Sequence, residues 1–259
     1  MIRSLYTAAT GMKAQQLFLD NVSNNLANIN TTGFKRSQVC FQDLLYDKKY
    51  MAGSESTQGF EIPSGISLGG GVRPIATSKI FTQGNQQTTG RSLDMAIEGN
   101  GFFQINRPDG IIAYSRDGSF ELNSKGEIVT ADGLPLSPSI TIQDAVEISI
   151  GTDGTVFVKG SDGSLQNVGQ IMLANFPNPS GLENTGKNMY IETIASGAPI
   201  VTAPGEQGAG GIYQGVLENS NVETVTELVN LITAQRAYEI NSRAIKASDE
   251  MLSTINQLT

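Results

Sequence analysis

The chain has 259 residues and a formal net charge of −8, with 39% hydrophobic residues, no Trp and no His. The missing His removes the commonest general base and the commonest metal ligand of proteins. The lone Cys40 can form neither an internal disulfide nor a zinc site by itself. The negative charge argues against nucleic acid or an anionic membrane surface as partner. We therefore expect no cofactor, no bound metal and no nucleic acid, and we predict that the protein is not an enzyme.

No stretch of the sequence approaches the roughly 18 consecutive apolar residues that a membrane helix needs. Near the N-terminus the apolar stretch is broken by Thr7, Thr10 and Lys13, so it lacks the hydrophobic region of a cleavable secretion signal. We therefore expect no membrane insertion. The protein either stays in the cytoplasm or leaves it by a route that retains its N-terminus.

A helix is predicted over residues 4–29, because apolar residues recur there every seven positions. The main row is Leu5, Met12, Leu19 and Leu26, and the row three residues later is Ala8, Gln15, Val22 and Ile29. The helix should end near 28–33, where Asn and Gly tolerate the left-handed conformation of helix ends.

A second helix is predicted to begin at Ser220–Glu223, which has the spacing of a capping box. Its main apolar row is Leu231, Tyr238, Ile245 and Leu252, whereas the companion row begins with Leu228 and continues with polar residues. One apolar row is too thin for a stable isolated pair, so we interpret the helix as a contact for several neighbours. The alternative is that both are ordinary amphipathic helices packed on a globular core.

The middle of the chain is predicted to be rich in antiparallel strands. Apolar runs at 101–105, 111–114, 155–158 and 171–176 are separated by turn pairs such as Asp132-Gly133 and Asp153-Gly154. Residues 46–70 show neither a helical nor a strand period and are expected to be an extended connection. The predicted fold class is α+β: terminal helices (1–32 and 217–259) form a coiled-coil-like inner domain, 33–79 form a connector, and 80–216 form an antiparallel β-rich outer domain.

A stretch with the spacing of a nucleotide-binding P-loop runs from Gly181 to Asn188. A P-loop needs Ser or Thr at its last position to bind Mg²⁺, and it needs a following helix whose N-terminus holds phosphate. Here Asn188 occupies that position and the next residues are typical of a strand. We therefore reject nucleotide binding.

Three separate blocks of sequence resemble the bacterial flagellar rod and hook proteins. They are 23–36 (SNNLANINTTGFKR), 93–103 (LDMAIEGNGFF) with 114–120 (YSRDGSF), and the C-terminal stretch 220–258, which contains AQRAYE at 234–239. The residues that carry the terminal signatures are Asn24, Asn25, Ala27, Asn28, Gly33, Phe34, Lys35, Gln235, Arg236 and Tyr238.

Within this family, the length of the chain and the segment at about 46–65 are most similar to the distal rod subunits. Hook subunits usually carry an extra outer domain, and proximal rod subunits are the nearest alternative. The resemblance implies a homo-oligomer, a helical polymer that forms a hollow rigid drive shaft, transmits torque to the hook and serves as export channel. It also implies proximal rod subunits, hook subunits and the P- and L-ring proteins as partners.

The resemblance further implies export by the flagellar type III apparatus, without a cleaved signal peptide, to a basal body that spans the periplasm. Phe41 and Leu45 are then candidates for a short hydrophobic export signal, although they could equally anchor the first helical region. The residues expected at subunit interfaces are Leu5, Met12, Leu19, Val22, Leu26, Leu228, Leu231, Tyr238, Ile245 and Leu252. The two rival hypotheses are a secreted enzyme that uses Asp and Glu and a trimeric fibre protein.

Overall fold

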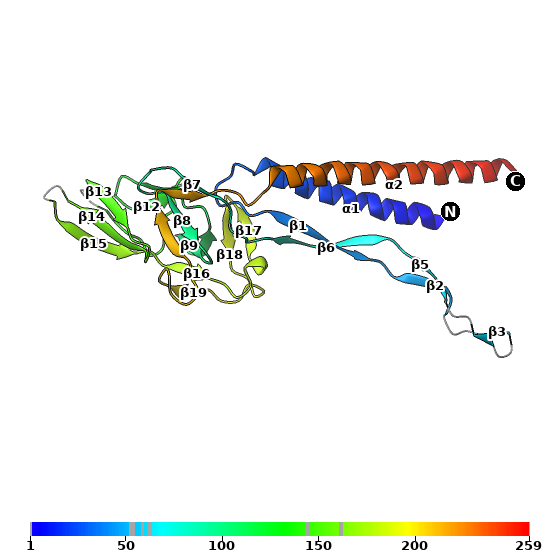
Figure 1. Ribbon diagram of the computed structural model, residues 1–259, viewed down its shortest axis with the longest axis horizontal. Helices are drawn as coiled ribbons and strands as arrows, with labels where there is room; N and C mark the ends of the chain where they lie inside the picture. The colour runs from blue at the N-terminus through cyan, green and yellow to red at the C-terminus, as the bar shows by residue number, and fades with distance from the viewer. Residues whose placement is uncertain are drawn as a thin grey trace. The chain divides into compact units, whose positions relative to one another are not determined.

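A computed structural model describes residues 2–51, 55–57, 60–61, 64–142, 146–160 and 163–258 (Figure 1). The chain divides into two compact units. The terminal unit comprises 1–26, 37–78 and 224–259, and the β unit comprises 27–36 and 79–223. The prediction of one helix at each end of the chain and a β-rich middle is confirmed.

Two helices, α1 (Ile2–Ala27) and α2 (Thr224–Leu258), run antiparallel in the terminal unit (Figure 1). The hydroxyls of Ser4 and Ser248 are 3.2 Å apart, and a Cβ added at Gly11 would lie 3.0 Å from Nδ2 of Asn241. Each step of seven residues along α1 is thus matched by seven residues back along α2. Small side chains at these positions allow the two helices to approach closely.

The structure corrects two details of the predicted C-terminal helix. It begins at Thr224 and not at Ser220, because the Asn221 side chain accepts a hydrogen bond from the Arg36 amide and donates to the Ile80 carbonyl. The α2 row that is most buried is Glu227, Ala234 and Ser248, one residue before the predicted companion row. Small residues occupy most of this row because an antiparallel partner in the same chain packs along it.

The segment expected to be an extended connection contains paired strands of the terminal unit. These are β1 (Ser37–Asp43) with β6 (Val72–Lys79), β2 (Tyr46–Tyr50) with β5 (Ile66–Gly69), and β3 (Glu55–Thr57) with β4 (Phe60–Glu61). The β2–β5 ribbon is exposed along both strands, so its sequence shows no alternation of apolar and polar residues. Residues 52–54, 58–59 and 62–63 of the predicted 46–65 insertion lie outside the described residues.

The β unit is built on a six-stranded antiparallel sheet, with smaller sheets beside it. The sheet order is β17 (Glu183–Gly186), β18 (Met189–Ile191), β10 (Ile112–Ser115), β9 (Phe102–Asn106), β16 (Leu173–Asn175) and β19 (Ile200–Thr202). A three-stranded sheet contains β13 (Glu147–Ile150), β14 (Thr155–Lys159) and β15 (Leu165–Gln170). The remaining strands form two-stranded sheets: β11 (Phe120–Leu122) with β12 (Ile128–Thr130), β8 (Met95–Glu98) with β20 (Gly211–Gln214), and β7 (Gln86–Thr88) with β21 (Val216–Glu218).

Two packed clusters stabilise the β unit. The larger is aliphatic with a pair of Phe rings, and it includes Met95, Phe103, Phe120, Leu136 and Ile171, all fully buried. The smaller contains the edge-to-face aromatic rings Phe102, Tyr114, Phe176 and Tyr190. Burial raises the pKa of Tyr190 to about 12. This dense core makes the β unit the rigid body of the molecule.

The stretch that mimics a P-loop is a β-hairpin. One 3₁₀ turn, η1 (Pro179–Gly181), precedes it, and β17 and β18 are joined by Lys187 and Asn188, with φ of 55° and 57°. Two successive left-handed residues are typical of a type I′ hairpin turn. The strand β18 follows this turn, in place of the helix that a P-loop needs.

Residues 27–36 are fixed to the β unit by a buried group of charges, which we name the Lys35 clasp (Lys35, Arg116 and Glu218). Lys35 Nζ lies 2.6 Å from Glu218 Oε1 and donates to the Thr82 carbonyl at 2.8 Å, and the Lys35 and Glu218 side chains are 0% exposed. Arg116 Nη1 lies 3.5 Å from Glu218 Oε2. Burial lowers the pKa of Lys35, and the Glu218 charge opposes this shift. The clasp thus carries two cations on one carboxylate.

Gly33 allows the backbone to enter this site. Its φ is +66°, and a Cβ added there would lie 2.5 Å from the Asp117 amide nitrogen. The Gly33 amide donates to the Glu218 carbonyl at 2.8 Å. A larger residue would meet backbone atoms, which cannot move aside as a flexible side chain can.

Replacing Glu218 with Gln should lower the free energy of unfolding of the β unit by about 3–5 kcal/mol, because Lys35 and Arg116 would remain buried without a counter-charge. Urea titration followed by tyrosine fluorescence measures this change, since Tyr114 and Tyr190 are buried in the β unit. The matched control is Glu121→Gln, whose carboxylate pairs with Arg91 but is 61% exposed, and which should cost less than about 1 kcal/mol. Equal effects of the two variants would contradict the assignment.

Candidate functional site

The described residues offer little for catalysis or metal binding. Among them there is no group of three or more His, Cys, Asp or Glu side chains placed to hold a metal ion. Within the same described ranges, no helix combines the length and the apolar character needed to span a bilayer. These findings direct attention to surfaces rather than to a reactive centre.

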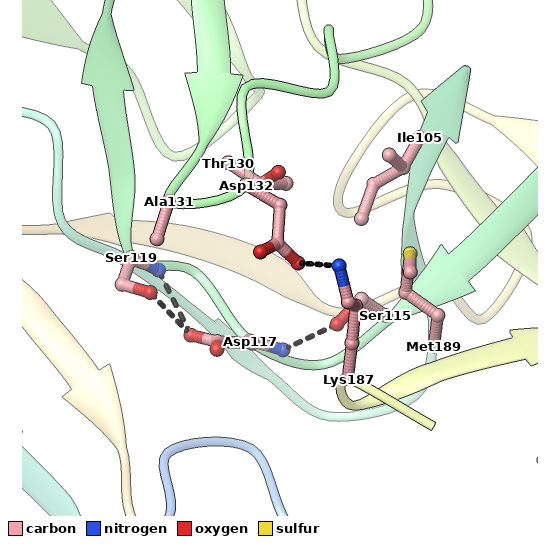
Figure 2. A pocket seen from close by; sticks show the side chains of 9 residues that line it. All are labelled: Ile105, Ser115, Asp117, Ser119, Thr130, Ala131, Asp132, Lys187 and Met189. Carbon is pink, nitrogen blue, oxygen red and sulfur yellow. Dashed lines mark hydrogen bonds and ion pairs between the residues drawn. The ribbon is translucent and has the colours of Figure 1, made fainter. Parts of the chain in front are cut away.

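A small polar pocket in the β unit illustrates the point (Figure 2). It has about 60 Å³ of free space, room for only a few water molecules. Asp117 Oδ1 accepts hydrogen bonds from the amide and hydroxyl of Ser119, and Lys187 Nζ pairs with Asp132 Oδ2 at 3.3 Å. Ser115 Oγ donates to the Asn188 carbonyl. These bonds hold turns together, and no side chain is arranged as a nucleophile with its base.

The exposed apolar side chains are the distinctive feature of the terminal unit. All three hydrophobic clusters found among the described residues lie in the β unit. Among the terminal-unit residues whose burial the structure describes, the buried apolar ones are Ala8, Ala14, Val22, Val39 and Ala234. Its exposed large apolar residues are Tyr6, Phe41, Leu45, Tyr46, Tyr50, Met51, Ile66, Leu68, Ile75, Val225, Leu228, Val229, Ile232, Tyr238, Ile240, Met251 and Ile255. Such a surface is typical of protein–protein contact.

The predicted interface residues differ in how far their side chains are exposed to solvent. Val22 is buried within the terminal unit, so its side chain packs inside the subunit. Leu228 and Tyr238 are exposed. The others are partly buried: Leu5, Met12, Leu19, Leu26, Leu231, Ile245 and Leu252. The seven-residue rows thus lie mainly on the flank of the helix pair, where most of these side chains are partly covered by their own subunit and partly exposed to solvent.

A second row of apolar side chains on α2 was missed by the sequence analysis. We name it the outer stripe: Val225, Val229, Ile232, Ile240 and Met251, all exposed. At 3.6 residues per turn, most of it lies about half a turn away from the buried Ala234. A helical period of 3.6 would have revealed it, whereas a strict seven-residue template selects the flank facing α1.

An apolar groove lies between α1 and the loops that join the strands of the terminal unit. We name it the N-terminal groove; it is lined by Arg3, Tyr6, Leu44, Leu45 and Gly70. Arg3 holds its rim in place, with Nη1 2.6 Å from Asp47 Oδ2 and Nη2 donating to the Leu68 carbonyl. Leu45 is 93% exposed.

The two residues of the candidate export signal have different surroundings. Phe41 contacts Phe18 of α1 edge to face, with ring centroids 6.3 Å apart, whereas Leu45 projects into solvent at the groove. Phe41 therefore contributes to packing in the folded subunit, and Leu45 does not.

The N-terminal signature residues have mainly structural contacts. Asn25 is buried and exchanges two hydrogen bonds with the Ser37 backbone, both 2.9 Å. Asn28 Oδ1 accepts from Thr31. Gly33, Phe34 and Lys35 are buried in the β unit, with Lys79 Nζ 4.3 Å from the centre of the Phe34 ring.

The remaining signature residues are exposed. They are Asn24 and Ala27 on α1, and Gln235, Arg236 and Tyr238 on α2. The signatures therefore divide between side chains that fold the subunit and side chains on the surface of the terminal helices.

Comparison with known proteins agrees with this arrangement of helices and strands. Residues 5–35 match the family described as flagella basal body rod protein, 96–158 match the flagellar hook protein FlgE/F/G D1 domain, and 213–258 match the flagellar basal body rod FlgEFG protein C-terminal family.

Full-length relatives carry the name flagellar basal-body rod protein FlgG. The chain is 51% identical to that of Buchnera aphidicola subsp. Schizaphis graminum over the full length of both proteins, and 49% identical to that of Caulobacter vibrioides over 99% of each. It is 40% identical to that of Bacillus subtilis, covering 100% of this chain and 99% of the relative. The chain therefore belongs to the FlgG-like family of flagellar rod and hook proteins, which are structural proteins of the flagellar basal body and not enzymes.

Proposed function

We propose that this protein is the subunit of the distal rod, and that it polymerises helically through its terminal unit into a hollow, rigid shaft. One observation carries the proposal: among the described residues, the unit that holds no hydrophobic cluster is the unit with the larger number of exposed large apolar side chains. Apolar burial is the main favourable term in association, and contact with a neighbouring subunit would bury these side chains.

The proposed polymer uses different surfaces on the two sides of each contact. The outer stripe of α2 and the N-terminal groove are distinct patches of one subunit. Joining unlike patches gives a heterologous contact, which propagates into a helix when it does not close into a ring. Helices from successive copies would pack as a coiled-coil-like inner tube, with the β units as an outer layer.

We further propose the roles that belong to such a rod. The shaft transmits motor torque to the hook, and its lumen is the path of exported subunits. Its partners are the proximal rod subunits, the hook subunits and the surrounding P- and L-ring proteins. The names of the relatives support a place for this protein in the basal-body rod. The dense β unit supports the mechanical role, because close-packed interiors are stiff.

Ile232→Glu should prevent assembly or raise the concentration needed for it by at least about ten-fold. Burying one Ile contributes roughly 1.5–3 kcal/mol, and about 1.4 kcal/mol corresponds to a factor of ten. Sedimentation and negative-stain imaging of the concentrated full-length protein measure this: the parent protein should give hollow rods.

Gln235→Glu is the matched control, since this side chain is also exposed on α2 but points about 60° away from the nearest member of the outer stripe. It should assemble as the parent does. Assembly of Ile232→Glu at the parent's concentration would contradict the role of the outer stripe. A compact monomer with enzymatic turnover, or a trimeric spike, would contradict the proposed function altogether.

Joining Leu45 directly to Ile66, which removes residues 46–65, should give a more flexible or more curved filament. The β2–β5 ribbon is exposed on both faces, and we propose that it lies between neighbouring subunits and restrains bending. Curvature measured on electron micrographs tests this. Filaments as straight as those of the parent would show that the ribbon does not restrain bending.

Ser substitutions at Phe41 and Leu45 should block export while leaving cellular expression unchanged, because a short hydrophobic signal loses its apolar side chains. The amount of protein outside the cytoplasm, compared with the total by immunoblot, is the measurement. Gln42→Ser is the control, as Gln42 lies within the same segment but is polar and contacts Arg73. Normal export of the double variant would show that the two residues serve only the folded subunit.

A further inference from the structure

The C-terminal end of α2 extends beyond the start of α1. Ser4 lies beside Ser248 and Gly11 beside Asn241, so the same register places Ile2 opposite Glu250. Residues 251–258 therefore continue past the first residue of α1, and Figure 1 shows the end of α2 projecting beyond that of α1. At about 1.5 Å per residue, this extension is roughly 12 Å long. We name residues 247–257 the C-terminal tip.

The tip is both apolar and acidic. Ala247, Glu250, Met251, Thr254 and Ile255 line a shallow concavity on it, and Met251 is 50% exposed. Asp249 and Glu250 are exposed, and no basic residue follows Lys246 in the sequence. The last turn of α2 has no basic side chain to offset the negative end of the helix dipole.

The N-terminal groove has the complementary character. Tyr6 is 68% exposed, and with Leu45 it offers an apolar floor. Lys48 and Lys49 on β2 are exposed and follow the groove residue Leu45 by three and four positions in the sequence, and the Arg3 charge on the rim is offset by Asp47. The first turn of α1 contains no acidic residue, so the positive end of its dipole is not offset there.

We propose that the C-terminal tip of one subunit docks in the N-terminal groove of a second copy of this chain. The tip of the same chain cannot fill the groove, because α2 is one continuous helix and its contact at Ser248 directs the tip away from Arg3 and Tyr6. The contact joins unlike surfaces, so it repeats from copy to copy. This inference rests on the proposed function and specifies one of its contacts.

Disulfide trapping between two full-length chains tests the docking. Both carry Cys40→Ser, which removes the only native cysteine. One chain carries Leu45→Cys and the other, with a size tag, carries Met251→Cys; they are mixed, assembled and oxidised. A mixed dimer on a non-reducing gel is expected, forming at least about ten-fold faster than with the control partner Gln235→Cys, which is also exposed but lies outside both the tip and the outer stripe.

The outcomes separate this inference from the proposed function. If rods form but the Met251→Cys chain gives no more mixed dimer than the control, the docking is overturned and the rod remains. If the chains do not assemble at any concentration, both fail.

Charge reversal gives a second measurement that needs no cross-link. Glu250→Lys and Lys49→Glu should each slow assembly roughly two- to five-fold, the range of exposed ion pairs, and mixing the two chains should restore part of the rate. Equal slowing in the mixture and in the separate chains would also overturn the docking.

Discussion

The ion pair between Lys35 and Glu218 is the contact on which the rest of the subunit depends. These residues are 183 positions apart in sequence, and neither side chain is exposed. Lys35 follows α1 by a few residues and Glu218 precedes α2 by a few, so one buried contact fixes the segments that lead to both helices. Because an isolated charge in the interior is costly, each partner requires the other. The folded β unit therefore requires that Lys35 and Glu218 lie together, although they are far apart in the sequence.

The two units use apolar residues in opposite ways. In the β unit the apolar side chains are buried in the unit's own core, around Phe103 and Phe120. In the terminal unit Ser, Gly and Asn lie where the two helices meet, and many of the larger apolar residues remain on the surface. The β unit therefore has a core of its own, whereas the terminal unit keeps apolar side chains on its surface, where the proposed association with other copies would bury them.

Sequence reasoning reached the fold class because two long helical patterns flank a region of strands and Gly turns. It misplaced the start of α2, since nothing local shows that Asn221 is engaged by the distant Arg36. It missed the β2–β5 ribbon, because a ribbon exposed on both faces has no alternating pattern. The outer stripe was missed because the sequence was compared with a strict seven-residue repeat and not with the 3.6-residue period of a helix. The Lys35 clasp could not be predicted, because its residues are far apart in the sequence and no local pattern links them.

The seam between α1 and α2 has a further consequence. Side chains such as Ser4, Gly11, Asn241 and Ser248 bury little apolar area, so closing the seam releases little free energy. Separating the two helices therefore requires little free energy, and α1 or α2 can leave the pair while the β unit stays folded. The terminal helices of a single subunit are thus the part of the chain that opens at the smallest cost in free energy.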